Sequence, residues 1–98
     1  MTVDIHELLS FAVKNRASDV HIGAGEVPSM RIDGEVRRLD VEPIGRDDAT
    51  RLAYSIMNEE QRVAFEEHLE VDFSIGVPDV ARFRAHVFTH ARGVGMAL

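Results

Sequence analysis

The segment between residues 80 and 93 has two different sides when it is read with the period of two of a β-strand. Successive side chains of a strand point to opposite faces of the sheet. One face of this segment would carry apolar and small residues, namely Phe83, Ala85, Val87 and Thr89. The other would carry a basic and aromatic row made of Arg82, Arg84, His86, Phe88 and His90, with Arg92 continuing it. The pattern predicts a strand with one core face and one cationic face.

Three segments have the periodicity of amphipathic helices. The first has an apolar side made of Ile5, Leu8, Leu9, Ala12 and Val13, and Thr2 or Asp4 can cap it. The second has an apolar side made of Ala49, Leu52, Ala53, Ile56 and Met57. The third begins at Asn58, where Gln61 can complete a capping box, and its narrow apolar stripe consists of Ala64, Phe65 and Leu69.

The remaining strands are predicted by shorter segments. Residues 17–22 form a short strand, and residues 30–36 form a hairpin with Asp33-Gly34 at its tip. Arg37-Arg38 interrupts the alternation, so we expect a bulge there. Residues 71–77 alternate, Pro78-Asp79 makes a turn into the basic strand, and residues 94–98 begin another strand. This order of elements predicts an α+β fold, an antiparallel sheet with helices packed on one face.

Composition narrows the class of protein. Ninety-eight residues suit one domain, and 45% hydrophobic with 29% charged residues are typical of a globular protein. The sequence contains no cysteine, no apolar run of membrane-spanning length and no signal-peptide pattern at its start. We therefore expect a cytoplasmic location.

A net charge of −6 argues against a nucleic-acid partner. It also makes the basic row unusual, either as a solvated face or as a dock for an anion or acidic partner.

Few residues suggest catalysis. Asp19 and His21 would share one face of a short strand, where they can hydrogen-bond or contribute to an acid–base or metal site. We favour an interdomain or structural polar pair over a catalytic one, because no cysteine or carboxylate cluster lies nearby in the sequence. The glycines at 23 and 25 are followed by Pro28, which does not suit a phosphate loop. The chain lacks a Walker A motif and its only lysine is Lys14, so we predict no catalytic residue, no metal site and no ATP hydrolysis by these residues.

Several short motifs, in this order and spacing, resemble the start of the secretion ATPase superfamily. Within it, the chain is similar over essentially its whole length to the N-terminal domain of the type IV pilus retraction ATPases, the PilT family. The motifs are Ala17-Ser-Asp-Val-His21, Arg31-Ile-Asp-Gly34 with Val36-Arg-Arg38, Ile56-Met-Asn58, Gln61-Arg62, Phe65-Glu66, Asp72-Phe-Ser74 and Val80-Ala-Arg-Phe-Arg84.

The resemblance implies a PAS-like accessory and assembly domain, here residues 1–98, followed by a RecA-like ATPase domain beyond residue 98. It implies a cytoplasmic homohexamer that uses ATP and Mg to drive pilus retraction and twitching motility. Its partners would be its own ATPase domain, the neighbouring subunits and the pilus machinery at the inner membrane. Without the ATPase domain we expect a monomer with no cofactor of its own.

In that family, arginines of the N-terminal domain reach toward the phosphates of a nucleotide between the two domains. Arg82, Arg84 and Arg92 are the residues here that match this role by position. His86 stands where the resemblance leads us to expect a polar amide, and His90 also departs from it.

Other functions stay open at this point. The chain could be a free-standing PAS-like sensor or protein-interaction module, which a closed apolar cavity would favour. It could be a small enzyme that uses Asp19, His21 and His86, which turnover by the chain alone would favour. A relative that works in secretion or competence would have similar motifs. The sequence encoded after Leu98 would best discriminate among these alternatives.

Overall fold

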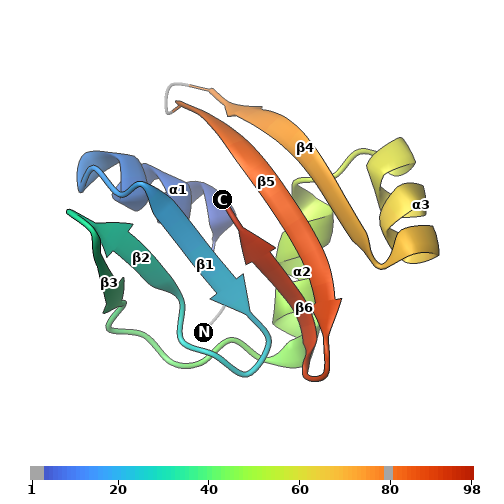
Figure 1. The fold of residues 1–98 in the computed structure, drawn as a ribbon, viewed down its shortest axis with the longest axis horizontal. Helices are drawn as coiled ribbons and strands as arrows, with labels where there is room; N and C mark the ends of the chain where they lie inside the picture. The colour runs from blue at the N-terminus through green and yellow to red at the C-terminus, as the bar shows by residue number, and fades with distance from the viewer. Residues whose placement is uncertain (1–3, 79–80) are drawn as a thin grey trace.

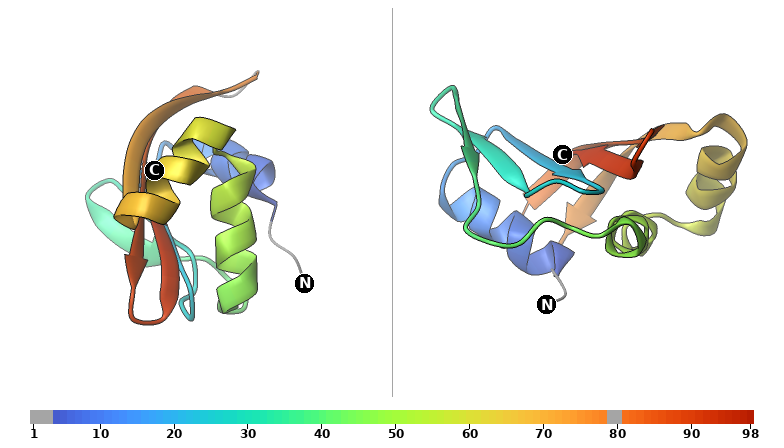
Figure 2. Two further views of the ribbon diagram at one scale, coloured as in Figure 1. Left: turned by 90° about the vertical axis from the view of Figure 1, so that its right-hand side faces the viewer. Right: turned by 90° about the horizontal axis from the view of Figure 1, so that it is seen from below.

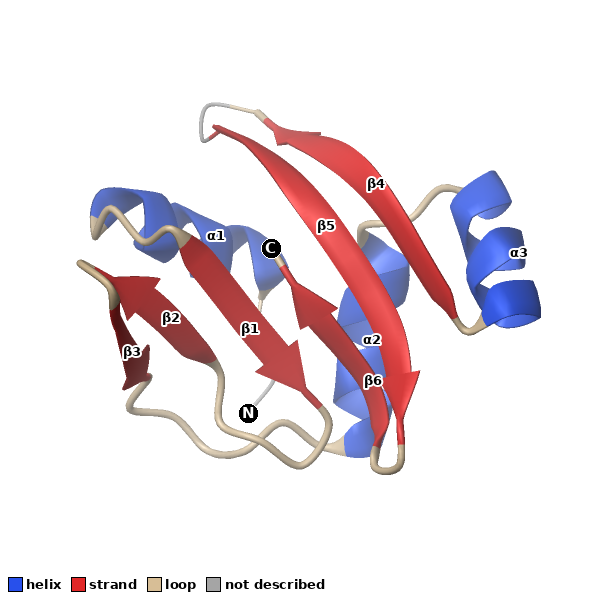
Figure 3. Cartoon of the chain, in the orientation of Figure 1, coloured by secondary structure: helices blue, strands red, loops and turns tan. Residues whose placement is uncertain are grey.

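Six strands form one antiparallel sheet, and the computed structural model describes residues 4–78 and 81–98 (Figures 1 and 3). The chain runs through α1 (Ile5–Lys14), β1 (Asp19–Gly23), β2 (Ser29–Ile32), β3 (Glu35–Arg38), α2 (Arg46–Ser55), α3 (Glu59–His68), β4 (Glu70–Val77), β5 (Ala81–His90) and β6 (Gly93–Ala97). The predicted α+β class is confirmed. Thr2 and Asp79, predicted as a helix cap and a turn residue, lie outside the described residues.

The order of strands across the sheet is β3-β2-β1-β6-β5-β4. The last strand, β6, therefore lies in the middle, between β1 and β5 (Figure 1). β4 and β5 form a long hairpin with eight paired positions, from Glu70 opposite Phe88 to Val77 opposite Ala81. The first and last thirds of the chain thus meet along β1 and β6 at the centre of the sheet.

Helices α1 and α2 pack on one face of the sheet, and α3 lies beside β4 at its edge (Figure 2). The core lies between the sheet and these helices. Its largest fully buried side chains include Leu9 of α1, Leu52 of α2, Val20 of β1, Val87 of β5 and Met96 of β6. The other face carries no helix of the described chain (Figure 2), and we call it the open face.

Local signals explain where the helices begin. The Asp4 carboxylate accepts hydrogen bonds from the backbone N–H groups of His6 and Glu7, which starts α1 as predicted. Asn58 and Gln61 form the predicted capping box of α3, with N···O distances of 2.8 and 2.9 Å. α2 follows Gly45, which has no side chain to cap it.

The prediction of the β2–β3 hairpin is confirmed, but the bulge expected at its end and the place of Leu69 in the third helix are wrong. Asp33 and Gly34 both have positive φ angles, 52° and 82°, as the tight β2–β3 turn requires. The expected bulge at Arg37-Arg38 is absent, because β2 and β3 pair without interruption from Ser29–Arg38 to Ile32–Glu35. Leu69 does not belong to an apolar helix stripe. It ends α3 with φ 64° and is 58% exposed.

One polar contact joins α2 to α3. The Tyr54 hydroxyl donates to the Glu66 carboxylate at 3.1 Å, and the Arg62 guanidinium lies 4.5 Å from the centre of the Tyr54 ring. Burial raises the pKa of Tyr54 above its ordinary value of 10.0, and the hydrogen bond and negative charge of Glu66 raise it further. This contact lies on the helix side of the molecule, away from the basic row.

Candidate interaction face of the sheet

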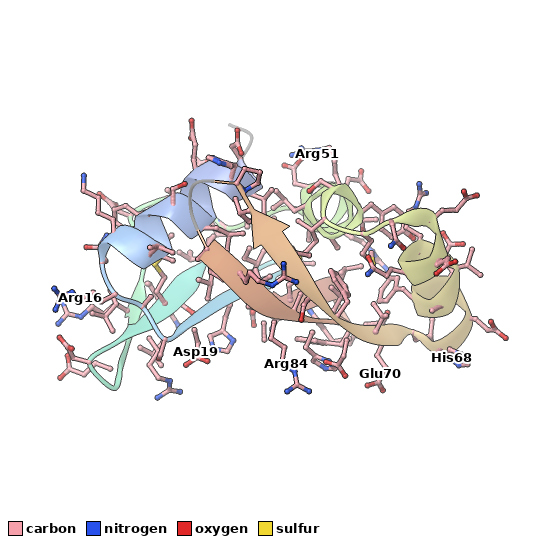
Figure 4. The ribbon with its side chains drawn as sticks, turned by 90° about the horizontal axis from the view of Figure 1, so that it is seen from above. Arg16, Asp19, Arg51, His68, Glu70 and Arg84 are labelled. Carbon is pink, nitrogen blue, oxygen red and sulfur yellow. The ribbon has the colours of Figure 1, made fainter. Side chains whose placement is uncertain are left out.

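The open face carries the polar row that the alternation of β5 predicts. Ala85 and Val87 are fully buried against the helices, while Arg82 and Arg84 are exposed on the opposite side. Figure 4 shows Arg84, Asp19 and Glu70 on the side of the sheet away from α1 and α2. The predicted separation of the two faces of β5 is therefore confirmed, although on the core side Phe83 is only partly buried and Thr89 is exposed.

The middle of the row is an aromatic stack rather than a run of free cations. Phe88 stacks on His86 with ring centroids 5.3 Å apart, and His90 lies 6.1 Å from Phe88 on its other side. The Phe88 ring covers Gly95 of β6, where an added Cβ would lie 2.6 Å from the ring. Asp72 of β4 pairs with His86, with 2.8 Å between Oδ1 and Nδ1. A carboxylate thus faces the centre of the row and reduces its positive potential.

Arg82 and Arg84 occupy the end of the row beside the β4–β5 connection. Arg82 lies across Gly76 of β4, with Nη1 3.0 Å from the position that a Cβ would take there. Within residues 4–78 and 81–98, neither arginine has an ion pair or a side-chain hydrogen bond. These two guanidinium groups therefore offer donors that suit a phosphate or a carboxylate.

A cleft of about 510 Å³ adjoins this end of the row. It opens where residues 81–85 of β5 run past the end of β6, whose pairing with β5 stops at His86 opposite Ala97. Apolar residues of α1, β1, β5 and β6 line the cleft, and Asp19, Asp72, Arg82 and Arg84 contribute charged groups to its lining. The cleft can take a ligand or a segment with both apolar and charged groups.

Arg92 does not continue the row as the alternation predicts. β5 ends at His90, and Arg92 lies in the turn before β6. His90 is eight residues after Arg82 along the strand, which is roughly 26 Å at about 3.3 Å per residue. Arg82 and Arg92 therefore cannot contact the same phosphate group. Arg92 instead forms an ion pair with Glu26 of the β1–β2 connection, with 2.9 Å between Nη2 and Oε1.

Asp19 and His21 share the open face, but the described residues contain no hydrogen bond between them. Asp19 pairs with Arg31 of β2, with 3.3 Å from Nε to Oδ2, and accepts a bond from the Ser18 hydroxyl. The predicted bond between Asp19 and His21 is thus replaced by a cross-strand ion pair, since Asp19 stands opposite Arg31 in the sheet. This geometry favours a structural role for Asp19 over a catalytic one.

The sequence did not reveal Glu26, Arg31 and Asp72 as partners of candidate residues. They pair with Arg92, Asp19 and His86, respectively. Each partner comes from another strand or loop, so no local spacing signals the contact. The described residues contain no group of three histidine, aspartate or glutamate side chains placed to hold a metal ion. In the same residues, no helix is both long and apolar enough to cross a membrane.

Known proteins are similar to this chain in sequence and in fold. The type IV pilus retraction ATPase PilT of Pseudomonas aeruginosa is 50% identical over 93 residues, which cover 95% of this chain and 27% of PilT. This chain is a homologue of the N-terminal region of PilT. A twitching motility protein of Neisseria gonorrhoeae is 38% identical over 66 residues, covering 67% of this chain and 18% of that protein.

The fold also matches a solved structure of the pilus retraction motor PilT with bound ADP. The TM-score is 0.90 and the identity 41%, and the match covers 97% of this chain and 28% of the PilT chain. The chain thus spans about a quarter of the length of its PilT relatives. No family model matches the sequence.

Proposed function

We propose that this chain is the N-terminal accessory and assembly domain of a hexameric, ATP-driven motor for type IV pilus retraction. The observation that carries the proposal is the 50% identity to PilT over 95% of the chain. A RecA-like domain beyond residue 98 supplies the phosphate loop and the Mg site, and this domain supplies arginines to a nucleotide site between the two. The motor works in the cytoplasm beside the pilus machinery of the inner membrane.

The arginines along β5 and just beyond its end support this role. Arg82 and Arg84 lie near the start of β5, and Arg92 lies in the turn that follows its last residue, His90. In a closed ring with head-to-tail contacts, each N-terminal domain has two neighbours, its own ATPase domain and that of the next subunit. Guanidinium groups at both ends suit a domain that meets phosphates or acidic groups on two sides.

The test is a comparison of arginine variants in the full-length protein. We expect Arg84→Gln and Arg92→Gln to lower ATP turnover by at least tenfold while the hexamer still assembles, because they remove charge that acts on the phosphates. Arg37→Gln, on the exposed edge strand β3, is the matched control. Normal turnover in both test variants would remove the arginines from the nucleotide site.

The 98-residue chain provides a second test. With no phosphate loop it should bind ATP with Mg only feebly and should not hydrolyse it. It should also sediment as a monomer, because one half of each heterologous contact is missing. Submicromolar binding in isothermal titration, or a stable hexamer of the chain alone, would contradict the two-domain assignment.

A free-standing PAS-like sensor is the alternative. Such a sensor would need an enclosed, largely apolar cavity for its ligand. The cleft beside β5 opens to solvent between charged side chains, which favours contact with another domain or an anion over an enclosed ligand. A full-length gene product without a phosphate loop would favour the sensor.

A further inference from the structure

Arg92 and Glu26 hold two distant turns together. They are 66 residues apart in the sequence, and Arg92 Nη2 donates to Glu26 Oε1 at 2.9 Å. Glu26 belongs to the connection between β1 and β2, and Arg92 belongs to the turn between β5 and β6. β1 and β6 are antiparallel neighbours in the sheet, so the turn that follows β1 and the turn that precedes β6 lie at the same end of these strands.

Gly23 and Gly25, at this end of the strands, leave room for the two side chains to contact each other. Oε2 of Glu26 lies 2.6 Å from the position that a Cβ on Gly23 would take, and Cδ of Arg92 lies 3.4 Å from the corresponding position on Gly25. Larger residues at these glycines would displace the carboxylate or crowd the arginine. The absence of side chains at both sites therefore lets the ion pair lie along the backbone.

The glutamate end of this pair is the more firmly anchored. The Glu26 backbone N–H donates to the Gly23 carbonyl at 3.1 Å, and its carbonyl accepts from the Ile44 N–H at 2.9 Å. The backbone N–H of Arg92 donates to His90 Nδ1 at 3.2 Å, within its own hairpin. The carboxylate thus stays at a defined place, and the longer arginine side chain reaches it.

The Glu26 carboxylate is already paired with the Arg92 guanidinium, which is the group that would contact a phosphate. A carboxylate and a phosphate compete for the same N–H donors of a guanidinium. The Arg92 side chain is 62% exposed and the Glu26 side chain 53%. Exposed pairs of this kind are weak, so an incoming phosphate can displace the carboxylate.

We propose that Glu26 is a positioning residue that holds Arg92 back until the phosphate of a bound nucleotide displaces its carboxylate. This inference rests on the proposed function, in which Arg92 faces nucleotide in the assembled motor. It adds a residue that tunes nucleotide affinity without contacting the nucleotide. The ion pair forms in the free domain and is exchanged for a phosphate contact in the loaded one.

The experiment measures the dissociation constant for ADP and the KM and kcat for ATP in the full-length protein. Four proteins are compared, the wild type, Glu26→Gln, Arg92→Gln and the double variant. Glu26→Gln should lower the dissociation constant and the KM by about two- to fivefold with little change in kcat, the size expected when an exposed ion pair no longer competes. It should have no such effect in the Arg92→Gln background.

Glu35→Gln is the matched control, because Glu35 pairs with Arg37 at 3.4 Å on the exposed β2–β3 hairpin. It removes the same charge but should leave nucleotide affinity unchanged. If Glu26→Gln tightens binding to the same extent in the Arg92→Gln background, the charge acts at a distance, which overturns the inference. Unchanged or weaker binding by Glu26→Gln overturns it as well.

If Arg92 does not face the nucleotide, so that the proposed function itself fails at this residue, the experiment gives a different result. Arg92→Gln would then leave both ADP affinity and KM unchanged, and the inference would fall with it. If Arg92→Gln weakens binding and Glu26→Gln has no effect, only the role of Glu26 is wrong. Thermal melts of all variants ensure that the comparison is made on folded proteins.

Discussion

The two faces of β5 differ in what keeps their side chains in place. On the covered face, Ala85 and Val87 are fully buried under the helices, with Val87 opposite Met96 of β6. On the open face, Arg84 is exposed, and His86 contacts an aspartate and a neighbouring ring. Burial of apolar area stabilises the first set, whereas weak charge and ring contacts hold the second. The same strand can therefore change its open face with little loss of stability.

The largest effect is expected on the covered face. Met96 is 1% exposed in the middle of the sheet, and Met96→Ala should lower the free energy of unfolding by about 2–5 kcal/mol, because it removes buried atoms and leaves a cavity. Urea denaturation of the chain measures this.

Arg84→Ala is the open-face counterpart of Met96→Ala. Its cost should stay within about 1 kcal/mol, since exposed charges contribute little to folding. Similar losses for the two variants would mean that the faces do not differ as described.

A smaller effect is expected where the open face is most tightly packed. An alanine Cβ at Gly95 would lie 2.6 Å from the Phe88 ring, which His86 and His90 flank. Gly95→Ala should therefore destabilise the chain by about 1 kcal/mol. In a Phe88→Ala background the same change should be neutral or stabilising, because alanine costs less entropy than glycine in a strand. A double-mutant cycle by urea denaturation tests the contact, and additive effects would exclude it.

The smallest effect concerns the polar contact on the helix side. Tyr54 is the only tyrosine and there is no tryptophan, so absorbance reports its titration directly. Burial and Glu66 raise its pKa above 10.0. The resulting stabilisation is fully present below pH 10 and is lost as the pH rises through the folded-state pKa. Glu66→Gln should lower the pKa but keep it above 10.0, because burial remains. A midpoint at or below 10.0 in the wild type would contradict the contact.

Much of the fold could be predicted because its signals are local. Asp4, the Asn58–Gln61 box and the Asp33-Gly34 tip act on backbone groups within a few residues, so the sequence alone indicates where helices and turns begin. The period of two along β5 likewise predicts its two faces, since a pleated strand alternates whatever its neighbours are. Similarity to PilT is also visible in the short motifs.

Only the tertiary structure decided which groups meet across the sheet. The alternation extends the basic row to Arg92, but the chain turns after His90 and brings Arg92 to Glu26, 66 residues away. Asp72 meets His86 and Asp19 meets Arg31 because the strands pair in one register. Strand order and register depend on the packing of the whole core, which no short segment encodes. The sequence therefore determined the faces of the strands, and the folded sheet determined the partners of their charges.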